Sequence, residues 1–354
     1  MKLQKLRNAM KEQGWDAVLV TSELNERYLL GYPFTDGLLL ITATEAYMVT
    51  DFRYEEEAKK YADPAFEVVT PSPRAAFVAD VFEKNHVKTV GFENLTMTVS
   101  EYYAYESKYA GIEFRPIGNL LETMRQIKTP EEVELMKEAQ RITDAALAAL
   151  LKVLTPNMTE IDVAVELEYQ MRKLGAEGTA FDTIAVSGDA SALPHGHPRP
   201  EKLHKGFLTM DFGAKYQGYC SDMTRTVVIG RADKEIKKVY ETVLAAQKAG
   251  IAYLRAGADC GKADAAARDL INAAGYEGCF GHSLGHGVGL FIHEGPRLSS
   301  GSFGSVLEEG NVVTAEPGIY LNGKYGCRIE DMLLVTEDGA YDFTQSPKEL
   351  IEIY

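Results

Sequence analysis

Along the first third of the chain, segments with a strand-like pattern of hydrophobic residues alternate with segments that have a helix-like pattern. Short continuous apolar runs bounded by polar residues predict strands, and apolar residues spaced three to four apart predict helices. Strands are predicted at 15–21, 37–42, 46–51 and 89–92, and helices at 1–14, 53–61 and 73–84. This order predicts an α/β domain over residues 1–122, without a glycine-rich phosphate loop.

A second domain is predicted over residues 129–354, beginning with a helix start signal. Thr129 can cap the helix, Pro130 suits its first position, and Glu132 completes a capping box. A repeated order of two helices followed by strands predicts two related halves packed around a shared sheet. In the first half the helices are predicted at 130–150 and 159–174, and the strands at 183–187, 207–212 and 218–229. In the second half the helices are predicted at 234–254 and 261–274, and the strands at 311–315 and 328–336.

Composition and charge narrow the classes of function. Hydrophobic residues make up 45% and charged residues 25%, which is typical of a globular protein with a substantial core. The net charge of −15, without a dense Lys/Arg segment, argues against nucleic acid and anionic membranes as partners. The four cysteines lack paired spacing, and residues 1–14 predict a surface helix and not a secretory leader. We therefore expect a cytoplasmic protein.

Two aspartates interrupt neighbouring apolar strands of the first half. Asp211 ends the predicted strand 207–212, and Asp222 lies in the next strand, 218–229. A hairpin would bring the two carboxylates side by side. Buried carboxylates in contact repel each other unless they share a proton or a cation.

The second half contributes further candidate ligands. Glu316 follows the predicted strand 311–315, Glu330 lies in the strand 328–336, and His286 lies among glycines that allow close backbone approach. Four carboxylates and one imidazole form an oxygen-rich site that suits two divalent cations, Mn²⁺ or Co²⁺, with Zn²⁺ a further candidate. Four carboxylates balance two dications, which leaves a bridging hydroxide as the nucleophile of a hydrolase.

This ligand series resembles that of the pita-bread metallopeptidases, which include methionine aminopeptidase, aminopeptidase P and prolidase. Residues 129–354 resemble the catalytic domain, and residues 1–122 resemble the additional domain of prolidase, aminopeptidase P and creatinase. The fold implied is a creatinase-like α/β domain followed by a pita-bread α+β catalytic domain with pseudo-two-fold halves. Four segments match the proline-specific branch: 194–196, 292–294, 316–320 and 328–331.

The resemblance implies a role for each candidate ligand. Asp211 and Glu330 would bridge the two metals, and Asp222 would chelate one of them. His286 and Glu316 would complete the other metal's coordination. Glu316 would also accept the proton of the attacking water.

The resemblance further implies substrate-binding side chains. His195 and His293 would hold the substrate carbonyl and the tetrahedral intermediate. His282 would line the proline side, and Tyr320 would belong to the same substrate-binding group. His86, His197 and His204 are interpreted as structural.

Two arginines complete the predicted site. Arg328 lies two residues before Glu330, on the same predicted strand face, and could steady the metal carboxylates. Arg297 occupies a place where prolidases use a basic residue to bind the free carboxylate of a dipeptide. This favours dipeptides as substrates.

Two other hydrolase motifs are rejected. The segment 281–285 fits GxSxG, but no acidic residue lies between Ser283 and the histidines that follow it, so the order of a serine hydrolase triad fails. The segment 293–297 begins like HExxH, but Arg297 replaces the second histidine and Pro296 opposes a helix.

The sequence therefore predicts a metal-dependent enzyme that hydrolyses the bond preceding proline in small peptides. An Xaa-Pro dipeptidase is favoured, and an Xaa-Pro aminopeptidase acting on longer peptides is the alternative. A creatinase-like amidinohydrolase and a non-catalytic binding protein are weaker alternatives, because all five ligands are present. The family resemblance implies a homodimer.

Overall fold

The computed structural model describes residues 2–354 and divides the chain into two compact units, Met1–Arg125 and Gln126–Tyr354. Across the described residues, every helix is too short or too polar to span a bilayer. The functional residues predicted above all belong to the second unit.

The first unit is built on one mixed sheet with the strand order β4-β3-β2-β1-β5-β6. β1 pairs antiparallel with β2 and parallel with β5, and aromatic and aliphatic side chains form the buried core against the helices. The strands are β1 Ala17–Val20, β2 Leu38–Thr42, β3 Ala46–Val49, β4 Glu67–Val69, β5 Thr89–Phe92 and β6 Glu113–Pro116. The helices are α1 Lys2–Gln13, α2 Glu23–Leu30, α3 Phe52–Tyr61, α4 Arg74–Lys84, α5 Val99–Lys108 and α6 Leu120–Gln126.

The strong apolar runs of this unit form the predicted strands, and three predicted helices correspond to α1, α3 and α4. The helices α2, α5 and α6 and the strands β4 and β6 are not foreseen by the sequence reading. α5 has no fully buried residue and contacts the core only through partly buried tyrosines such as Tyr102 and Tyr105, so its apolar pattern is weak. Its evidence is local, a capping box between Thr98 and Glu101.

The second unit consists of two halves, each with a helix pair and a sheet that is antiparallel apart from the parallel pairing of β20 with β12. In the first half, the four-stranded sheet has the order β20-β12-β9-β8. Its helices are α7 Pro130–Leu150 and α8 Glu160–Lys173, and its strands are β7 Gly178–Thr179, β8 Ile184–Ser187, β9 Gly206–Phe212, β10 Ala214–Tyr216, β11 Tyr219–Cys220 and β12 Met223–Ile229. The predicted capping box of Thr129 and Glu132 at the start of α7 is confirmed.

In the second half, the five-stranded sheet has the order β14-β13-β15-β18-β19, with β16 and β17 as a separate hairpin. Its helices are α9 Lys234–Tyr253 and α10 Cys260–Ile271. Its strands are β13 Gly285–Gly287, β14 Glu294–Leu298, β15 Val312–Ala315, β16 Gly318–Leu321, β17 Tyr325–Arg328, β18 Asp331–Val335 and β19 Ala340–Asp342, while β20 Glu352–Ile353 returns to the first half's sheet.

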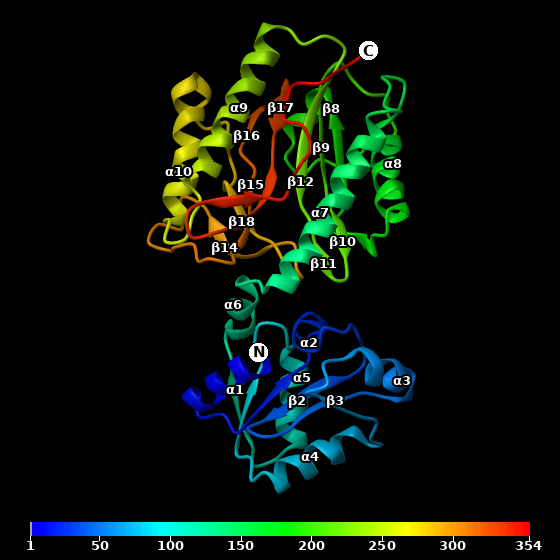
Figure 1. Cartoon of the computed structure of the whole chain (residues 1–354), viewed down its shortest axis with the longest axis vertical. Helices are drawn as coiled ribbons and strands as arrows, with labels where there is room; N and C mark the ends of the chain where they lie inside the picture. The colour runs from blue at the N-terminus through cyan, green and yellow to red at the C-terminus, as the bar shows by residue number, and fades with distance from the viewer. Residues whose placement is uncertain (1) are drawn as a thin grey trace. The chain divides into compact units, whose positions relative to one another are not determined.

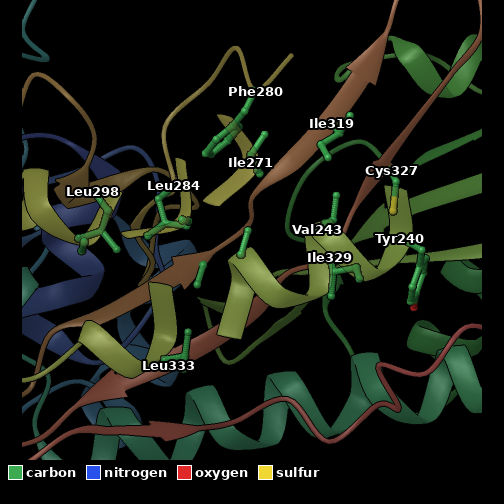
Figure 2. Close-up of a cluster of buried hydrophobic side chains, with 14 of the residues drawn as sticks. Tyr240, Val243, Ile271, Phe280, Leu284, Leu298, Ile319, Cys327, Ile329 and Leu333 are labelled. Atoms are coloured by element: carbon green, nitrogen blue, oxygen red, sulfur yellow. The ribbon is translucent and has the colours of Figure 1, made fainter. Parts of the chain in front are cut away.

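Within the second unit, the helix pairs α7–α8 and α9–α10 flank the strands (Figure 1). α7 and α8 pack on β9 and β12 through one buried cluster, and α9 and α10 pack on β15 and β18 through another. Figure 2 shows side chains of the second cluster, among them Val243 of α9, Ile271 of α10 and Leu333 of β18. The two helix pairs thus hold the strands that carry the predicted ligands.

Three sequence expectations for this unit are wrong. The halves have separate hydrogen-bonded sheets and not one shared sheet. The predicted strand 218–229 is broken at Ser221 and Asp222, between β11 and β12, and the predicted strand 328–336 is broken at Ile329 and Glu330, between β17 and β18. Polar residues mark both breaks, but the sequence does not show that the strands change partners there.

Candidate metal and substrate site

A cavity of about 450 Å³ in the second unit collects most of the predicted site residues. This size lies in the usual range for small-ligand sites. The lining includes His195, Asp211, Asp222, His282, His286, His293, Arg297, Glu316, Arg328 and Glu330. Tyr320 is not part of the lining, but its hydroxyl contacts two residues that are.

The four carboxylates occupy equivalent positions in the two halves. In the first half, Asp211 lies near the end of β9, and Asp222 directly precedes β12, its antiparallel partner. In the second half, Glu316 directly follows β15, and Glu330 directly precedes β18, its antiparallel partner. The duplicated architecture therefore supplies two carboxylates from each half to one cavity.

His286 lies between these carboxylates on β13. Its Nε2 atom is 3.5 Å from an oxygen of Asp222 and 3.5 Å from an oxygen of Glu316. A Cβ at Gly285 or Gly287 would lie 2.0 Å from a backbone oxygen of a neighbouring segment. Glycine is therefore required on both sides of His286, as the sequence predicts, so that the strand can pack closely.

The histidine is held in the form that binds a metal. Burial lowers the pKa of His286 to about 4, so the ring is neutral near pH 7. Its Nδ1 atom lies 3.0 Å from the Gly287 carbonyl oxygen, which calls for a proton on Nδ1. The lone pair of Nε2 then faces Asp222 and Glu316.

The carboxylates crowd each other in a buried space. Burial raises the pKa of Asp222 well above its ordinary value, and the negative charges of Asp211 and Glu316 raise it further. Burial and the negative charge of Asp222 raise the pKa of Glu330 well above its ordinary value. Burial raises the pKa of Glu316 to about 8, although Arg328 opposes the shift. Such a group of acids is stabilised by positive charge.

The donor atoms fit divalent cations. Asp222, His286 and Glu330 each offer one ligand atom, and these atoms lie within 4.8 Å of one another. The buried atoms Oδ1 of Asp211 and Oε1 of Glu330 have no hydrogen-bond partner among the described residues. Buried polar atoms are rarely left in this state, so a cation is the partner that these oxygens call for.

Arg328 connects the two halves of the carboxylate group. Its Nη2 atom donates to Asp211 at 2.6 Å, and its Nε atom donates to the Thr224 hydroxyl at 2.9 Å. Thr224 in turn donates to Glu330 Oε2 at 2.7 Å. Arg328 ends β17 and Glu330 follows it outside the strand, so the predicted shared strand face is wrong. The predicted contact of Arg328 with one of the candidate ligands, Asp211, is present.

Thr224 was not found by the sequence reading. It lies on β12, whereas Asp222 precedes that strand, so no shared strand face with Asp222 marks Thr224 in the sequence. The cross-strand partner of Thr224 is Asp211, which explains how one threonine comes between Arg328 and Glu330.

His282, His286 and His293 line the cavity together with the carboxylates, and His282 Nδ1 lies 3.8 Å from an oxygen of Glu316. His282 Nε2 lies 2.8 Å from the Tyr320 hydroxyl, which accepts a hydrogen bond from Arg328 Nη1 at 2.7 Å. The rings of His286 and His293 meet edge to face, with centroids 4.5 Å apart. Burial lowers the pKa of both His282 and His293. Neutral rings can donate or accept hydrogen bonds without adding charge.

His197 and His204, both interpreted from the sequence as structural residues, differ in position. His197 lines the cavity, so its assignment as purely structural is not supported by its position. His204 lies at the surface, 3.7 Å from Asp189 and 3.5 Å from Glu201. An exposed histidine in the loop 194–199 gives no periodic signal, which is why sequence alone could not place His197.

The segments that resemble GxSxG and HExxH do not lead into or form the helices that those motifs require. The segment after Ser283 continues into β13 and not into a helix, unlike a nucleophile elbow. Residues 294–298 form β14, so the segment resembling HExxH is not helical. Arg297 on β14 lies opposite His286 on β13.

Comparisons with known proteins agree with this site. The family model for metallopeptidase family M24 matches residues 134–337, and the model for the creatinase/prolidase N-terminal domain matches residues 2–127. A solved Xaa-Pro dipeptidase from Bacillus anthracis is 44% identical, with a TM-score of 0.95 and coverage of 99% of both chains.

Other relatives are also named as peptidases that act on Xaa-Pro substrates. A solved X-Pro aminopeptidase from Thermotoga maritima MSB8 is 35% identical, with a TM-score of 0.92 and coverage of 98% of this chain and 100% of that one. A protein of Pyrococcus furiosus named Xaa-Pro dipeptidase is 37% identical over 362 residues, covering 99% of each chain. Because the matches run through both units and the carboxylate cavity, we conclude that this chain is a peptidase of metallopeptidase family M24 with a creatinase/prolidase-type N-terminal domain.

Proposed function

We propose that this chain is an Xaa-Pro dipeptidase that uses two divalent cations, Mn²⁺ or Co²⁺. The observation that carries the proposal is that one cavity combines the crowded carboxylates with Arg297. The carboxylates suit cations, and a guanidinium suits the free carboxylate of a dipeptide. The names of the relatives from Bacillus anthracis and Pyrococcus furiosus favour the same substrate class.

Five side chains would hold the cations. In the proposal, Asp211 and Glu330 would bridge them, Asp222 would bind one, and His286 and Glu316 would complete the other. Bound divalent cations would polarise the substrate carbonyl and lower the pKa of water. The unpartnered oxygens of Asp211 and Glu330 support the bridging roles.

Glu316 is proposed to take up the proton of the attacking water. Its side chain remains 16% exposed, against 6% for Asp222, so its carboxylate is the more open of the two to the cavity. A general base must reach its proton directly or through one water, and this position allows it. A Glu316→Gln protein that retains full metal and wild-type turnover would refute the role.

Substrate orientation is assigned to the histidines and Arg297. His195 and His293 would hold the carbonyl and the tetrahedral intermediate, and His282 with Tyr320 would line the proline side. A carboxylate bound by Arg297 marks the end of a dipeptide, whereas a longer peptide must continue past it. A cytoplasmic homodimer completes the proposal, on the basis of the family resemblance.

The decisive experiment compares Ala-Pro with Ala-Pro-Ala in the presence of Mn²⁺ or Co²⁺. We expect Ala-Pro to be cleaved with the higher kcat/KM, activity to disappear with EDTA, and activity to return with added metal. Higher kcat/KM for Ala-Pro-Ala would make the enzyme an aminopeptidase. Cleavage of neither peptide, or cleavage that EDTA does not affect, would refute the proposal.

A variant tests the role of Arg297 separately. Arg297→Gln should raise the KM for Ala-Pro by about tenfold, because a charge-assisted pair is lost. The matched substrate is Ala-Pro amide, which lacks the carboxylate and should show less than a twofold change in KM. Equal effects on both substrates would show that Arg297 does not recognise the carboxylate.

A further inference from the structure

The segment 280–284 carries His282 to the cavity while its flanking side chains are buried. Phe280 is 3% exposed and Leu284 is fully buried, and both belong to the cluster around α9 and α10 (Figure 2). His282 lies between them and lines the cavity. A short segment that alternates between core and cavity must have a defined backbone position, since a small rotation would move the imidazole away from Tyr320.

An ion pair on α10 holds this backbone. Asp264 is 1% exposed, and its two carboxylate oxygens receive Nε and Nη2 of Arg268 at 2.7 and 2.8 Å. The same guanidinium donates to the carbonyl oxygens of Phe280 and His282 at 2.6 and 2.7 Å. Asp264 also accepts the backbone N–H of Leu284 at 2.9 Å.

The contacts lie on both sides of His282. Three backbone groups of the segment, the carbonyls of 280 and 282 and the N–H of 284, are bound by one pair of side chains. Neither Asp264 nor Arg268 lines the cavity. Any effect of the pair on substrate must therefore pass through the segment that it holds.

We propose that the Asp264–Arg268 pair positions His282 for contact with the proline side of the substrate. Arg268 is a positioning residue, and the proposal rests on the proposed function because it assumes that His282 contacts substrate. The planar guanidinium binds a carboxylate with one edge and two carbonyls with its remaining N–H groups. A lysine ammonium is a point donor and lacks this geometry, so Lys should not replace it.

A double-mutant cycle with His282 tests the proposal. In metal-loaded protein, Arg268→Lys should lower kcat/KM for Ala-Pro by about tenfold, mainly through KM, because a slight displacement of a substrate-binding group is costly. In the His282→Ala background, the same substitution should lower kcat/KM by less than about twofold. The urea midpoint of unfolding should fall equally in both backgrounds, which separates positioning from stability.

Controls make each outcome decisive. Arg141→Lys alters a pair within α7, formed with Glu138 and outside the cavity, and should leave kcat/KM unchanged. Asp264→Asn is a milder variant that can still accept the Leu284 N–H, and it replaces Arg268→Lys if that protein does not fold. The same loss of kcat/KM in both His282 backgrounds, or no loss in either, would overturn the proposal.

A second readout does not depend on peptide cleavage. The imidazole ¹⁵N signals of His282 are assigned by their loss in His282→Ala. Arg268→Lys should shift them, while the signals of His86 in the first unit remain unchanged. If wild-type protein cleaves no Xaa-Pro peptide, the proposed function fails, and unshifted His282 signals would independently overturn the positioning role.

Discussion

The buried carboxylate of Glu160 and the buried carboxylates of the cavity, both in the second unit, have pKa values shifted in opposite directions. Glu160, at the start of α8, is fully buried but receives five hydrogen bonds. Two come from Ser187, and three come from the backbone N–H and guanidinium of Arg199. Burial raises the pKa of Glu160, but the Arg199 and Ser187 donors outweigh it, so the pKa lies below its ordinary value.

Asp222 and Glu330 in the cavity are nearly as enclosed as Glu160 but have few donors. Glu330 is 1% exposed, receives one side-chain hydrogen bond from Thr224, and has a buried Oε1 atom without a partner among residues 2–354. Its pKa is raised by burial and by the charge of Asp222. Burial alone therefore does not indicate a metal site; a shortage of donors at neighbouring buried acids does.

The largest expected effects on activity and stability come from replacing Glu by Gln, first at Glu330 in the cavity and then at Glu160. Glu330→Gln should lower peptide hydrolysis by more than about 100-fold, because a proposed metal ligand is lost. In EDTA the variant should be more stable than wild type by about 1 kcal/mol, because a buried repulsion is removed. Hydrolysis assays and urea unfolding in EDTA measure the two effects. A loss of stability in EDTA would contradict the proposed shortage of donors.

Glu160→Gln should have the opposite effect on stability. Loss of the charge leaves Arg199 without its buried partner. The unfolding free energy should fall by about 2 kcal/mol, which is less than for a fully buried pair because Arg199 is partly exposed. Metal content, measured after gel filtration, should equal that of wild type. A decrease in metal content would mean that the Glu160 group and the cavity are not independent.

The smallest expected effect is the pH dependence of the unfolding free energy that Glu160 contributes. Because the folded-state pKa of Glu160 is lowered, its contribution to stability is complete above its unfolded pKa of about 4.5 and is lost as pH falls through the folded pKa. The difference in unfolding free energy between metal-free wild type and Glu160→Gln should therefore shrink below about pH 4.5. Urea titrations from pH 7 to pH 3 measure this difference. A constant difference over that range would show that the charge of Glu160 is not what stabilises the fold.

The sequence predicted elements whose signals are local. The capping box at Thr129 and the apolar strand 207–212 required only neighbouring residues, and both are found. The breaks at Asp222 and Glu330 were missed because strands end where their partners change, which depends on distant segments. The same limit applies to Thr224, whose role depends on Arg328, 104 residues away.

The sequence by itself determined the kinds of ligand, their order along the chain and the repeated strand pattern that carries them. Only the tertiary structure decided which buried acids are satisfied. Glu160 meets donors that lie 27 and 39 residues away, whereas Glu330 meets other acids and a single threonine. Composition and local pattern do not distinguish these acids, because the donors reach a carboxylate only when the chain folds.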